Sequence, residues 1–420
     1  MEKIEIKSIQ EQCKLAKESH IKTGKLSTDI KNLALRKIAV SIRENINFVI
    51  EANKKDINSA IKSGLSGHLV DRLTLDEQRL LNIANSVETI ASLEDPTGEI
   101  ISDWTVENGL RISKVRVPLG VIGIVYEARP NVTIDAAALA LKTGNAIVLR
   151  GSSSAMESNL ALVRLFKEVL FDIGIHPEIV QLLMDTSHES VIDLIRMDDY
   201  LDVVIPRGSS TLIETVVKNA TVPTIETGIG NCHVFIDKYA NLENAKKIII
   251  NSKTHRPTVC NSAESLLLHS ELDAAYISSV LSSLTSLGVT IKGCKRINEL
   301  YKNSHLASEL DYYTEFLDLR LSVKMVDSVE QAIEHISKFG SHHTESIVSE
   351  NSNSIQMFID NIDAAAVLVN ASTRFTDGGE FGFGAEMGIS TQKMHPRGPM
   401  GLSELTTYKY IVRGNGHIRK

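Results

Sequence analysis

The chain has 420 residues, 43% of them hydrophobic, a size and composition that predict two or three domains with ordinary soluble cores. Its formal charge is −7, from 45 basic and 52 acidic residues interspersed along the chain, so the charge pattern gives no sign of a nucleic-acid-binding surface. No signal-peptide core opens the sequence, and the apolar run from Val117 to Tyr126 is too short to cross a bilayer. We therefore expect a cytoplasmic protein without a membrane span.

The apolar pattern along the chain predicts helices first and then two series of alternating strands and helices. Residues from about 3 to 93 have apolar positions at helical spacing and predict a helical lead-in. The first series has strands at 121–126, 146–149, 179–183 and 203–205, with helices at 158–171 and 190–197. The second has strands near 234–236, 265–268 and 364–369, with helices near 242–250, 271–284 and 329–339. Such alternation predicts an α/β fold with parallel sheets covered by helices on both faces.

Two segments alternate polar and apolar residues and fit neither series. They are Glu99 to Arg111 with the strand after it, and Thr406 to Arg413. This pattern is typical of strands with one exposed face. A strand at the C-terminus needs a pairing partner, which an edge strand of the same chain could supply.

Cys260 is the strongest candidate for a reactive residue. A nucleophilic cysteine needs positive or hydrogen-bond-donating neighbours that favour its thiolate, and His255 and Arg256 are close in sequence. The alternative is a small apolar core residue, as we interpret Cys232. The four cysteines are widely spaced without a Cys-x-x-Cys pair, which predicts neither a metal site nor a disulfide framework.

A glycine and hydroxyl residues follow the strand predicted at 203–205. A dinucleotide-binding Gly-x-Gly-x-x-Gly motif is not placed correctly in this chain. Gly208 and Ser209, however, lead into a helical pattern at 212–218, where free amides suit an anion such as a cofactor pyrophosphate. An ordinary helix cap is the alternative.

Several ordered segments resemble one family. They are 117–131, 142–151, 204–209, 226–233 and the run Arg-Pro-Thr-Val-Cys-Asn at 256–261. Together they are similar to the aldehyde dehydrogenase superfamily. The runs 375–382 and 392–402 narrow the resemblance to one branch, the gamma-glutamyl phosphate reductases, and the resemblance covers nearly the whole chain.

The resemblance implies an aldehyde dehydrogenase-like α/β architecture, with two Rossmann-like parallel-sheet domains and a small oligomerisation arm. Residues 1–98 and 114–230 would form the NADPH-binding domain with its helical lead-in, and 231–402 the catalytic domain carrying Cys260. Residues 99–113 and 403–420 would form arms that pair across the interface of a homodimer or homotetramer.

The resemblance also assigns catalytic roles. Cys260 would be the nucleophile, and Asn131 would donate to the oxyanion together with the Cys260 amide. Glu226 matches the glutamate with which hydrolytic aldehyde dehydrogenases activate water. Because a reductase must protect its thioester from water, Glu226 has a structural or proton-transfer role as its alternative.

Cofactor and substrate contacts follow from the same alignment. Arg150, Ser152 and Ser153 lie where the family has Lys-Pro-Ser-Glu at the adenosine ribose. Arg150 replaces the lysine and Ser153 the acid, which favours NADPH, since arginine and serine can bind a 2′-phosphate. The alternative for Arg150 is a solvated charge at a strand end. The cationic candidates for the substrate are His255, Arg256, Arg129, His395 and Arg397, with ordinary salt bridging as the alternative for each.

The reaction that the resemblance implies is NADPH-dependent reduction of L-glutamyl 5-phosphate to L-glutamate 5-semialdehyde through a cysteine thioester, with phosphate release. This is a step of L-proline biosynthesis, with functional coupling to glutamate 5-kinase. Three other classes stay open: a hydrolytic aldehyde dehydrogenase using the same cysteine and Glu226, a thiol hydrolase or acyltransferase without nicotinamide, and a non-catalytic scaffold.

Overall fold

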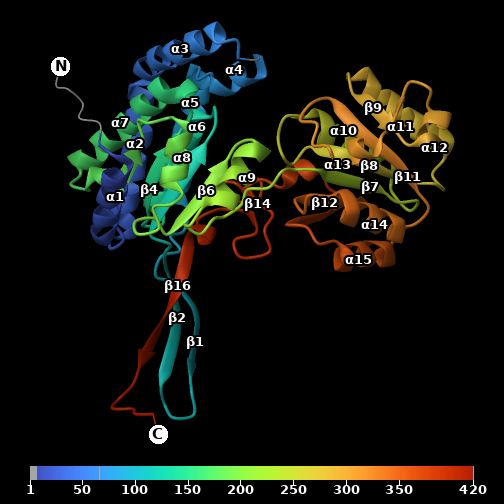
Figure 1. Ribbon diagram of the computed structural model, residues 1–420. Helices are drawn as coiled ribbons and strands as arrows, with labels where there is room; N and C mark the ends of the chain where they lie inside the picture. The colour runs from blue at the N-terminus through green and yellow to red at the C-terminus, as the bar shows by residue number, and fades with distance from the viewer. Residues whose placement is uncertain (1–6, 66, 420) are drawn as a thin grey trace. The chain divides into compact units, whose positions relative to one another are not determined.

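The computed structural model describes residues 7–65 and 67–419 and divides the chain into two compact units (Figure 1). Unit 1 comprises 1–226, 382–388 and 400–420, and unit 2 comprises 227–381 and 389–399. The predicted boundary at 230 differs by four residues, and the predicted catalytic domain included 382–388 and 400–402. These segments belong to unit 1 because Met387 and Met400 are buried in its core. Residues 3–6 of the predicted lead-in lie outside the described residues.

Five helices open unit 1, as the helical spacing predicts. They are α1 (Ile9–Thr23), α2 (Thr28–Glu44), α3 (Ile46–Lys62), α4 (Gly67–Leu73) and α5 (Glu77–Ser92). Local sequence fixes their starts: the Ser8 and Glu11 side chains form a capping box at α1, and Asp76 caps α5. The apolar stripe Leu35, Ile38 and Ile42 of α2 is fully buried.

A four-stranded parallel sheet, in the order β5-β4-β3-β6, forms the centre of unit 1. Its strands are β3 (Val121–Tyr126), β4 (Ala146–Arg150), β5 (Val180–Leu182) and β6 (Val203–Arg207). The helices between and after them are α6 (Pro130–Lys142), α7 (Met156–Asp172), α8 (His188–Leu194) and α9 (Ser210–Asn219). The strand order reverses between β3 and β6, and ligands of open α/β sheets bind at such a switch point.

A three-stranded antiparallel sheet forms the arm, and it belongs to unit 1 (Figure 1). Its strands are β1 (Ile100–Thr105), β2 (Arg111–Pro118) and β16 (Thr406–Arg413). The C-terminal strand β16 pairs with β2 of the same chain along its whole length, from Thr406 opposite Pro118 to Arg413 opposite Arg111. The partner that β16 requires is therefore present within the chain.

Unit 2 contains a seven-stranded parallel sheet in the order β10-β9-β11-β8-β7-β12-β13. Its strands are β7 (Cys232–Ile236), β8 (Ala263–His269), β9 (Thr290–Gly293), β10 (His305–Leu306), β11 (Arg320–Val326), β12 (Thr344–Val348) and β13 (Ala366–Val369). Its helices are α10 (Leu242–Thr254), α11 (Ala274–Ser286), α12 (Lys295–Leu300), α13 (Glu309–Tyr313), α14 (Val329–Phe339) and α15 (Ser352–Asn361). A two-stranded ribbon of β14 (Ile389–Ser390) and β15 (Gly398–Pro399) completes the unit.

The two parallel sheets confirm the predicted α/β class. The strands β3, β4, β7, β8 and β12 are buried along their whole length, as expected of parallel strands covered on both faces. A helix both long and apolar enough to cross a membrane does not occur in the part of the chain that the structure describes.

Candidate active site

Cys260 lies in the loop that connects α10 to β8, at the amino edge of the unit 2 sheet. Its side chain is half-buried. The loops that precede β7, β11 and β12 reach the same edge, because all these strands are parallel. Residues distant in sequence can thus support the cysteine from several sides.

Residues 230–232, at the start of β7, contact the peptide of Cys260. The fully buried Cys232 Sγ lies 3.2 Å from the Cys260 carbonyl oxygen and donates to it. A Cβ added at Gly230 would collide with the backbone of Cys260, so only glycine permits this approach. The Gly230 amide in turn donates to Glu315 Oε1 at 2.6 Å. Cys232 is therefore more than the packed thiol that the sequence suggested.

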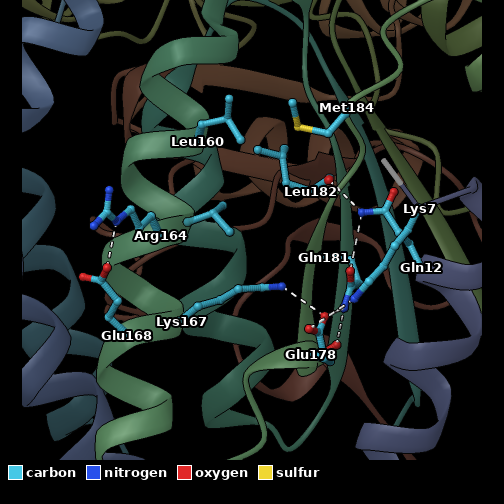
Figure 2. Close-up of a pocket in the computed structure, with 11 residues that line it drawn as sticks. Lys7, Gln12, Leu160, Arg164, Lys167, Glu168, Glu178, Gln181, Leu182 and Met184 are labelled. Carbon is cyan, nitrogen blue, oxygen red and sulfur yellow. Dashed lines mark hydrogen bonds and ion pairs between the residues drawn. The ribbon is translucent and has the colours of Figure 1, made fainter. Parts of the chain in front are cut away.

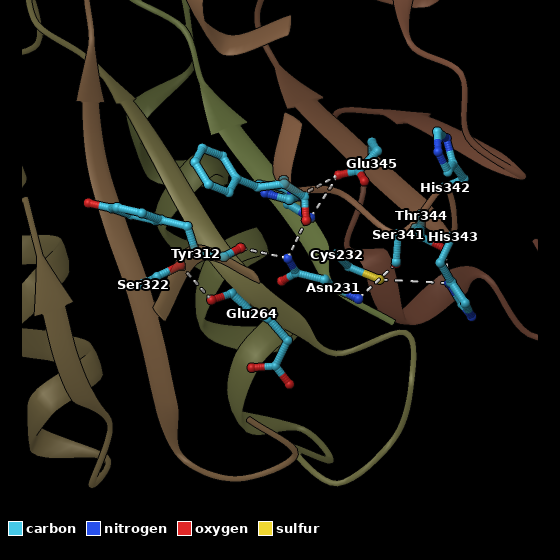
Figure 3. A network of polar contacts seen from close by, with 12 residues as sticks. Asn231, Cys232, Glu264, Tyr312, Ser322, Ser341, His342, His343, Thr344 and Glu345 are labelled. Atoms are coloured by element: carbon cyan, nitrogen blue, oxygen red, sulfur yellow. Dashed lines mark hydrogen bonds and ion pairs between the residues drawn. The ribbon is translucent and has the colours of Figure 1, made fainter. Parts of the chain in front are cut away.

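Figure 3 shows the polar network around Cys232. Its Sγ also lies 3.7 Å from His343 Nδ1. Burial, followed by the negative charge of Glu345, raises the pKa of the Cys232 thiol well above its ordinary value. The thiol therefore stays protonated at neutral pH and remains a donor. Glu345 itself accepts from the amide and from Nδ1 of His233 at 2.8 and 3.0 Å.

A buried ion pair closes the base of the Cys260 loop. Lys253 Nζ, in the last turn of α10, lies 2.6 Å from Glu264 Oε2 in β8, and both side chains are fully buried. The second Glu264 oxygen accepts from the Leu317 amide at 3.2 Å. Burial raises the pKa of Glu264 and lowers that of Lys253, while the charge and hydrogen bond of each partner oppose these shifts. Removing either partner would leave a buried charge, so the pair fixes both ends of the loop.

The cationic residues predicted to bind the substrate in unit 2 differ in their surroundings. His255 and Arg256 are exposed in the Cys260 loop. Arg397 donates to Asp363 Oδ1 at 2.8 Å, and Lys393 binds the other oxygen of the same carboxylate. The hydrogen bonds from Lys393, which has the larger effect, and from Arg397 lower the pKa of Asp363 to about 2. Arg397 is thus neutralised by a protein carboxylate, whereas Arg256 is not in any of the ion pairs of the described residues.

Asn131 and Arg129 lie in unit 1, at the start of α6. Pro130 is the first residue of that helix, and Ala128 before it has a φ of 29°, a strained conformation for a residue with a Cβ. Asn131 is exposed, and its Nδ2 donates to Asp135 Oδ2 at 3.1 Å. Burial raises the pKa of Asp135 to about 6. Asp135, one helical turn later, orients the amide, a role that the sequence analysis missed although the i, i+4 spacing could have indicated it.

Glu226 is the last residue of the first segment of unit 1 and is half-buried. The segment before it runs beside β6, since the Ile225 amide donates to the Val204 carbonyl at 3.0 Å. The catalytic candidates thus divide between the units, with Asn131 and Glu226 in unit 1 and Cys260 in unit 2.

Gly208 and Ser209 flank the switch point of the unit 1 sheet, where we predicted an anion site. A protein carboxylate already lies there: the Ser209 amide and hydroxyl donate to Glu127 at 2.8 and 3.0 Å. A Cβ at Gly208 would lie 2.7 Å from the same carboxylate. Ser209 also caps α9 through the Leu212 amide. The Ser209 amide and hydroxyl at the start of α9 therefore bind a protein carboxylate, that of Glu127.

Arg150 lies at the end of β4 and is buried. Its Nε donates to Ser190 Oγ at 3.2 Å, and its Nη2 donates to the carbonyls of Thr186 and Ser187 at 2.7 Å each. The guanidinium thus holds the loop before α8, while Nη1 makes no hydrogen bond with the described residues. Arg150 is not a solvated charge.

Ser152 and Ser153 follow Arg150 at the start of a short 3₁₀ helix (Ser153–Ala155). The Ser152 hydroxyl caps this helix by accepting from the Ser154 amide at 3.2 Å. Ser153 is exposed, so its hydroxyl is accessible to a ligand.

Each unit also has a cavity away from these residues. In unit 1 a cavity of about 340 Å³ lies between α7 and the edge strand β5 (Figure 2). Its charged groups are satisfied within the protein, for example Lys167 by Glu178 at 3.1 Å. In unit 2 a cavity of about 500 Å³ is lined by residues of β11 and α14, among them Lys324 and His335. None of the predicted site residues lines either cavity.

The geometry can be compared with known proteins. Residues 5–295 match the model of the aldehyde dehydrogenase family. The chain therefore belongs to the aldehyde dehydrogenase family and is an oxidoreductase, and membership implies a nicotinamide cofactor.

Individual relatives narrow this assignment. A gamma-glutamyl phosphate reductase of Caldicellulosiruptor bescii is 52% identical over 414 residues, covering 98% of this chain and 99% of the relative. That of Clostridium perfringens (strain SM101) is 52% identical over 406 residues, covering 97% and 98%. A crystal structure of gamma-glutamyl phosphate reductase from Thermotoga maritima is 46% identical, with a TM-score of 0.96 over 99% of this chain and 100% of the other. Within its family, the chain is thus a member of the gamma-glutamyl phosphate reductases.

Proposed function

We propose that this chain catalyses the NADPH-dependent reduction of L-glutamyl 5-phosphate to L-glutamate 5-semialdehyde, a step of L-proline biosynthesis. The observation that carries the proposal is the Cys260 loop, whose backbone is held by Gly230 and Cys232 while the thiol is partly accessible. The names of relatives about half identical in sequence support the substrate and the direction.

In the proposed mechanism the Cys260 thiolate attacks the acyl carbon, and a C–S bond forms. The Asn131 amide and the Cys260 backbone N–H would donate to the developing oxyanion, a contribution of roughly 3 to 4 kcal/mol to the barrier. The C–O bond to phosphate then breaks, phosphate leaves with the electron pair, and a thioester remains on Cys260. When bound, NADPH supplies a hydride to the thioester carbon. Collapse of the resulting thiohemiacetal releases the aldehyde and restores the thiolate.

The residues of unit 1 fit a dinucleotide in two respects. The amides at the start of α9 already hold the Glu127 carboxylate, so they can hold a phosphate that replaces it. The Nη1 group of Arg150 and the exposed Ser153 are candidates for the 2′-phosphate that distinguishes NADPH from NADH. Ser152 would assist through its backbone, because its hydroxyl is used within the short helix.

The substrate and the assembly are further parts of the proposal. We infer that His255, Arg256 and Arg129 bind the anionic groups of the substrate, and that Arg397 acts through the position of its loop, since Asp363 neutralises it.

The arm carries exposed apolar side chains, including Trp104, Tyr410 and Val412 at 40%, 56% and 55% exposure. We propose that this surface pairs with a second copy of the chain in a homodimer or homotetramer. We further propose that the enzyme acts in the cytoplasm, functionally coupled to glutamate 5-kinase.

Phosphate dependence tests the function. Oxidation of glutamate semialdehyde by NADP should stop after one turnover per active site without inorganic phosphate, and added phosphate should restore steady turnover. The measurement is the absorbance of NADPH after rapid mixing, at an enzyme concentration high enough to resolve the burst. A hydrolytic aldehyde dehydrogenase, in which Glu226 delivers water, would turn over repeatedly without phosphate, and that result would overturn the reductase proposal.

A further inference from the structure

Arg374, which the sequence analysis did not select, lies in a loop attached to both ends of the Cys260 loop. It belongs to the 3₁₀ helix η3 (Thr373–Phe375), which follows β13. Asn261 Nδ2, directly after Cys260, donates to the Thr376 carbonyl at 2.8 Å and to the Arg374 carbonyl at 3.4 Å.

A second attachment lies at the other end of the Cys260 loop. Ser252 Oγ in α10 lies 3.0 Å from Ser372 Oγ and accepts from the Thr373 amide at 3.2 Å. Since η3 is fixed to α10 on one side and to Asn261 on the other, the position of Arg374 is tied to that of Cys260.

The guanidinium of Arg374 has no ion pair with any of the described residues. Its Nε is buried and has no hydrogen-bond partner in the part of the chain that the structure describes. Among the charged groups, Asp377 has the largest effect on the pKa of Arg374, and Glu380 acts in the same direction. Asp377 Oδ1 accepts from the amides of Gly379 and Glu380 at 2.8 and 3.4 Å rather than from the guanidinium. Arg256 and Cys260 are also among the groups whose charges act on the Arg374 guanidinium.

The five arginines of unit 2 differ in whether they form an ion pair with a protein carboxylate. Arg296, Arg320 and Arg397 each form an ion pair with an aspartate, at 2.8 Å in every case. Arg256 and Arg374 form no ion pair with the described residues. The two arginines without an ion pair among the described residues are thus Arg256, four residues before Cys260, and Arg374, whose loop is attached to both ends of the Cys260 loop.

We propose that Arg374, together with Arg256, forms the subsite that binds the phosphate group of the acyl phosphate and retains it as it leaves Cys260. This assignment deepens the proposed function and rests on it. A phosphate dianion can satisfy two guanidinium groups through charge-assisted, often bidentate hydrogen bonds. In the thioester step the negative charge passes from the thiolate to the departing phosphate, and both sites of charge lie within the field of the same two cations.

The kinetic test uses the oxidative direction, in which inorganic phosphate is a substrate. Arg374→Gln should raise the KM for phosphate about tenfold or more, because a charged hydrogen bond is lost, and leave the KM for NADP unchanged. Arg374→Lys should recover part of the loss, since it restores the charge without the fork. Arg296→Gln removes an exposed arginine of the same unit and serves as the matched control, with no change expected.

A second measurement does not depend on turnover. Inorganic phosphate alone should slow the alkylation of Cys260 by iodoacetamide in the wild type and in Arg296→Gln, and this protection should be lost in Arg374→Gln. Thermal melting of each variant establishes that it is folded before the rates are compared.

The outcomes separate this subsite from the proposed function. Phosphate-independent turnover of the wild type would overturn the function itself. Phosphate-dependent turnover with an unchanged phosphate KM and intact protection in Arg374→Gln would overturn only the subsite. A rise in the KM for the semialdehyde, with phosphate unaffected, would assign Arg374 to the substrate carboxylate and likewise overturn the phosphate assignment.

Discussion

Two anion-binding regions, one in each unit, differ in what the protein itself supplies. At the start of α9 in unit 1, the donors already hold the carboxylate of Glu127, and Arg150 at the end of β4 already holds backbone carbonyls. At the Cys260 loop in unit 2, Arg256 and Arg374 have no carboxylate partner among the described residues. A ligand anion at the first region would have to displace Glu127, whereas at the second it would meet arginines without an ion pair among the described residues.

This difference has an energetic consequence. A ligand that displaces Glu127 at the start of α9 would bind more weakly by the free energy of the Glu127 contact that is lost. Without a ligand, the donors of this site keep Glu127 as their hydrogen-bond acceptor. The partly buried Arg374 has no ion-pair partner among the described residues, which costs stability in the empty enzyme and would favour a bound anion. Under the proposed function, binding of the cofactor and chemistry on the substrate would thus depend on two different arrangements.

The largest expected effect comes from removing the thiol around which the second region is built. Cys260→Ser should lower turnover by more than about 100-fold, because a serine hydroxyl is not ionised at neutral pH and cannot replace the thiolate without a strong base to activate it. NADPH binding and the melting temperature should stay close to those of the wild type. Turnover, cofactor titration and thermal melting measure the three quantities, and activity above about a tenth of wild type would remove Cys260 from the role of nucleophile.

Arg150→Ala sharpens the comparison on the side of unit 1. If Nη1 binds the 2′-phosphate, the preference for NADPH over NADH should fall by roughly 1.5 to 3 kcal/mol, the value of a charged hydrogen bond. The melting temperature should fall as well, since the Thr186 and Ser187 carbonyls lose their donor. Ser190→Ala is the matched control, because it removes the partner of Nε and keeps the charge. Equal losses with both cofactors would show that Arg150 only supports the loop.

Cys232→Val tests whether the support of Cys260 matters for the chemistry. The change puts a somewhat larger apolar side chain in place of the donor to the Cys260 carbonyl, so kcat should fall about fivefold, as for the loss of one neutral hydrogen bond. Cys232→Ser, which keeps a donor, should restore kcat. Cys13→Val, at the other fully buried cysteine, controls for the change of side chain itself. If both valine variants lower kcat alike, or if serine does not rescue, Cys232 is a packing residue only.

Much of the fold could be predicted where burial is apolar and local. Helix α14 has the predicted bounds, 329–339, because its apolar stripe and its Ser328 cap are both visible in the sequence. Helix α10 runs four residues beyond the predicted end, through the polar residues 251–254. These residues carry no apolar period, yet Lys253 is fully buried because its partner Glu264 lies across the loop.

Strand β12 was not predicted for the same reason. All five of its residues are buried, but Thr344, Glu345 and Ser346 are polar and give no strand pattern. The partner of Glu345, His233, lies 112 residues earlier in the chain. A burial that depends on a distant polar partner cannot be detected from local periodicity.

The candidate site, too, could be predicted only where its signal is local in the sequence. Residues of matched motifs could be selected from the sequence, since the chemistry of Cys260, Asn131 and Gly208 is a property of the residue type. Their protein partners could not, because Glu127, Asp135 and Cys232 reach them only through the fold. Arg374 was missed for a related reason: a lone arginine has no local signal, and only its lack of a counterion beside Cys260 distinguishes it.

The smallest expected effect concerns Glu127, the internal anion of unit 1. Glu127→Gln keeps a side-chain oxygen that can accept from the Ser209 amide but removes the negative charge that competes with a phosphate at the start of α9. A charge at a helix end contributes about 0.3 to 1 kcal/mol, so the Kd for NADPH should fall roughly two- to fivefold. The gain should shrink as ionic strength rises, because an exposed charge is screened. Fluorescence titration of the full-length protein at low and high salt measures both effects.

Glu214→Gln, a change of the same charge within α9 itself, is the control, and its Kd should stay close to that of the wild type. An unchanged or higher Kd in Glu127→Gln would show that the carboxylate does not occupy the phosphate position. The two regions would then differ less than their contacts indicate.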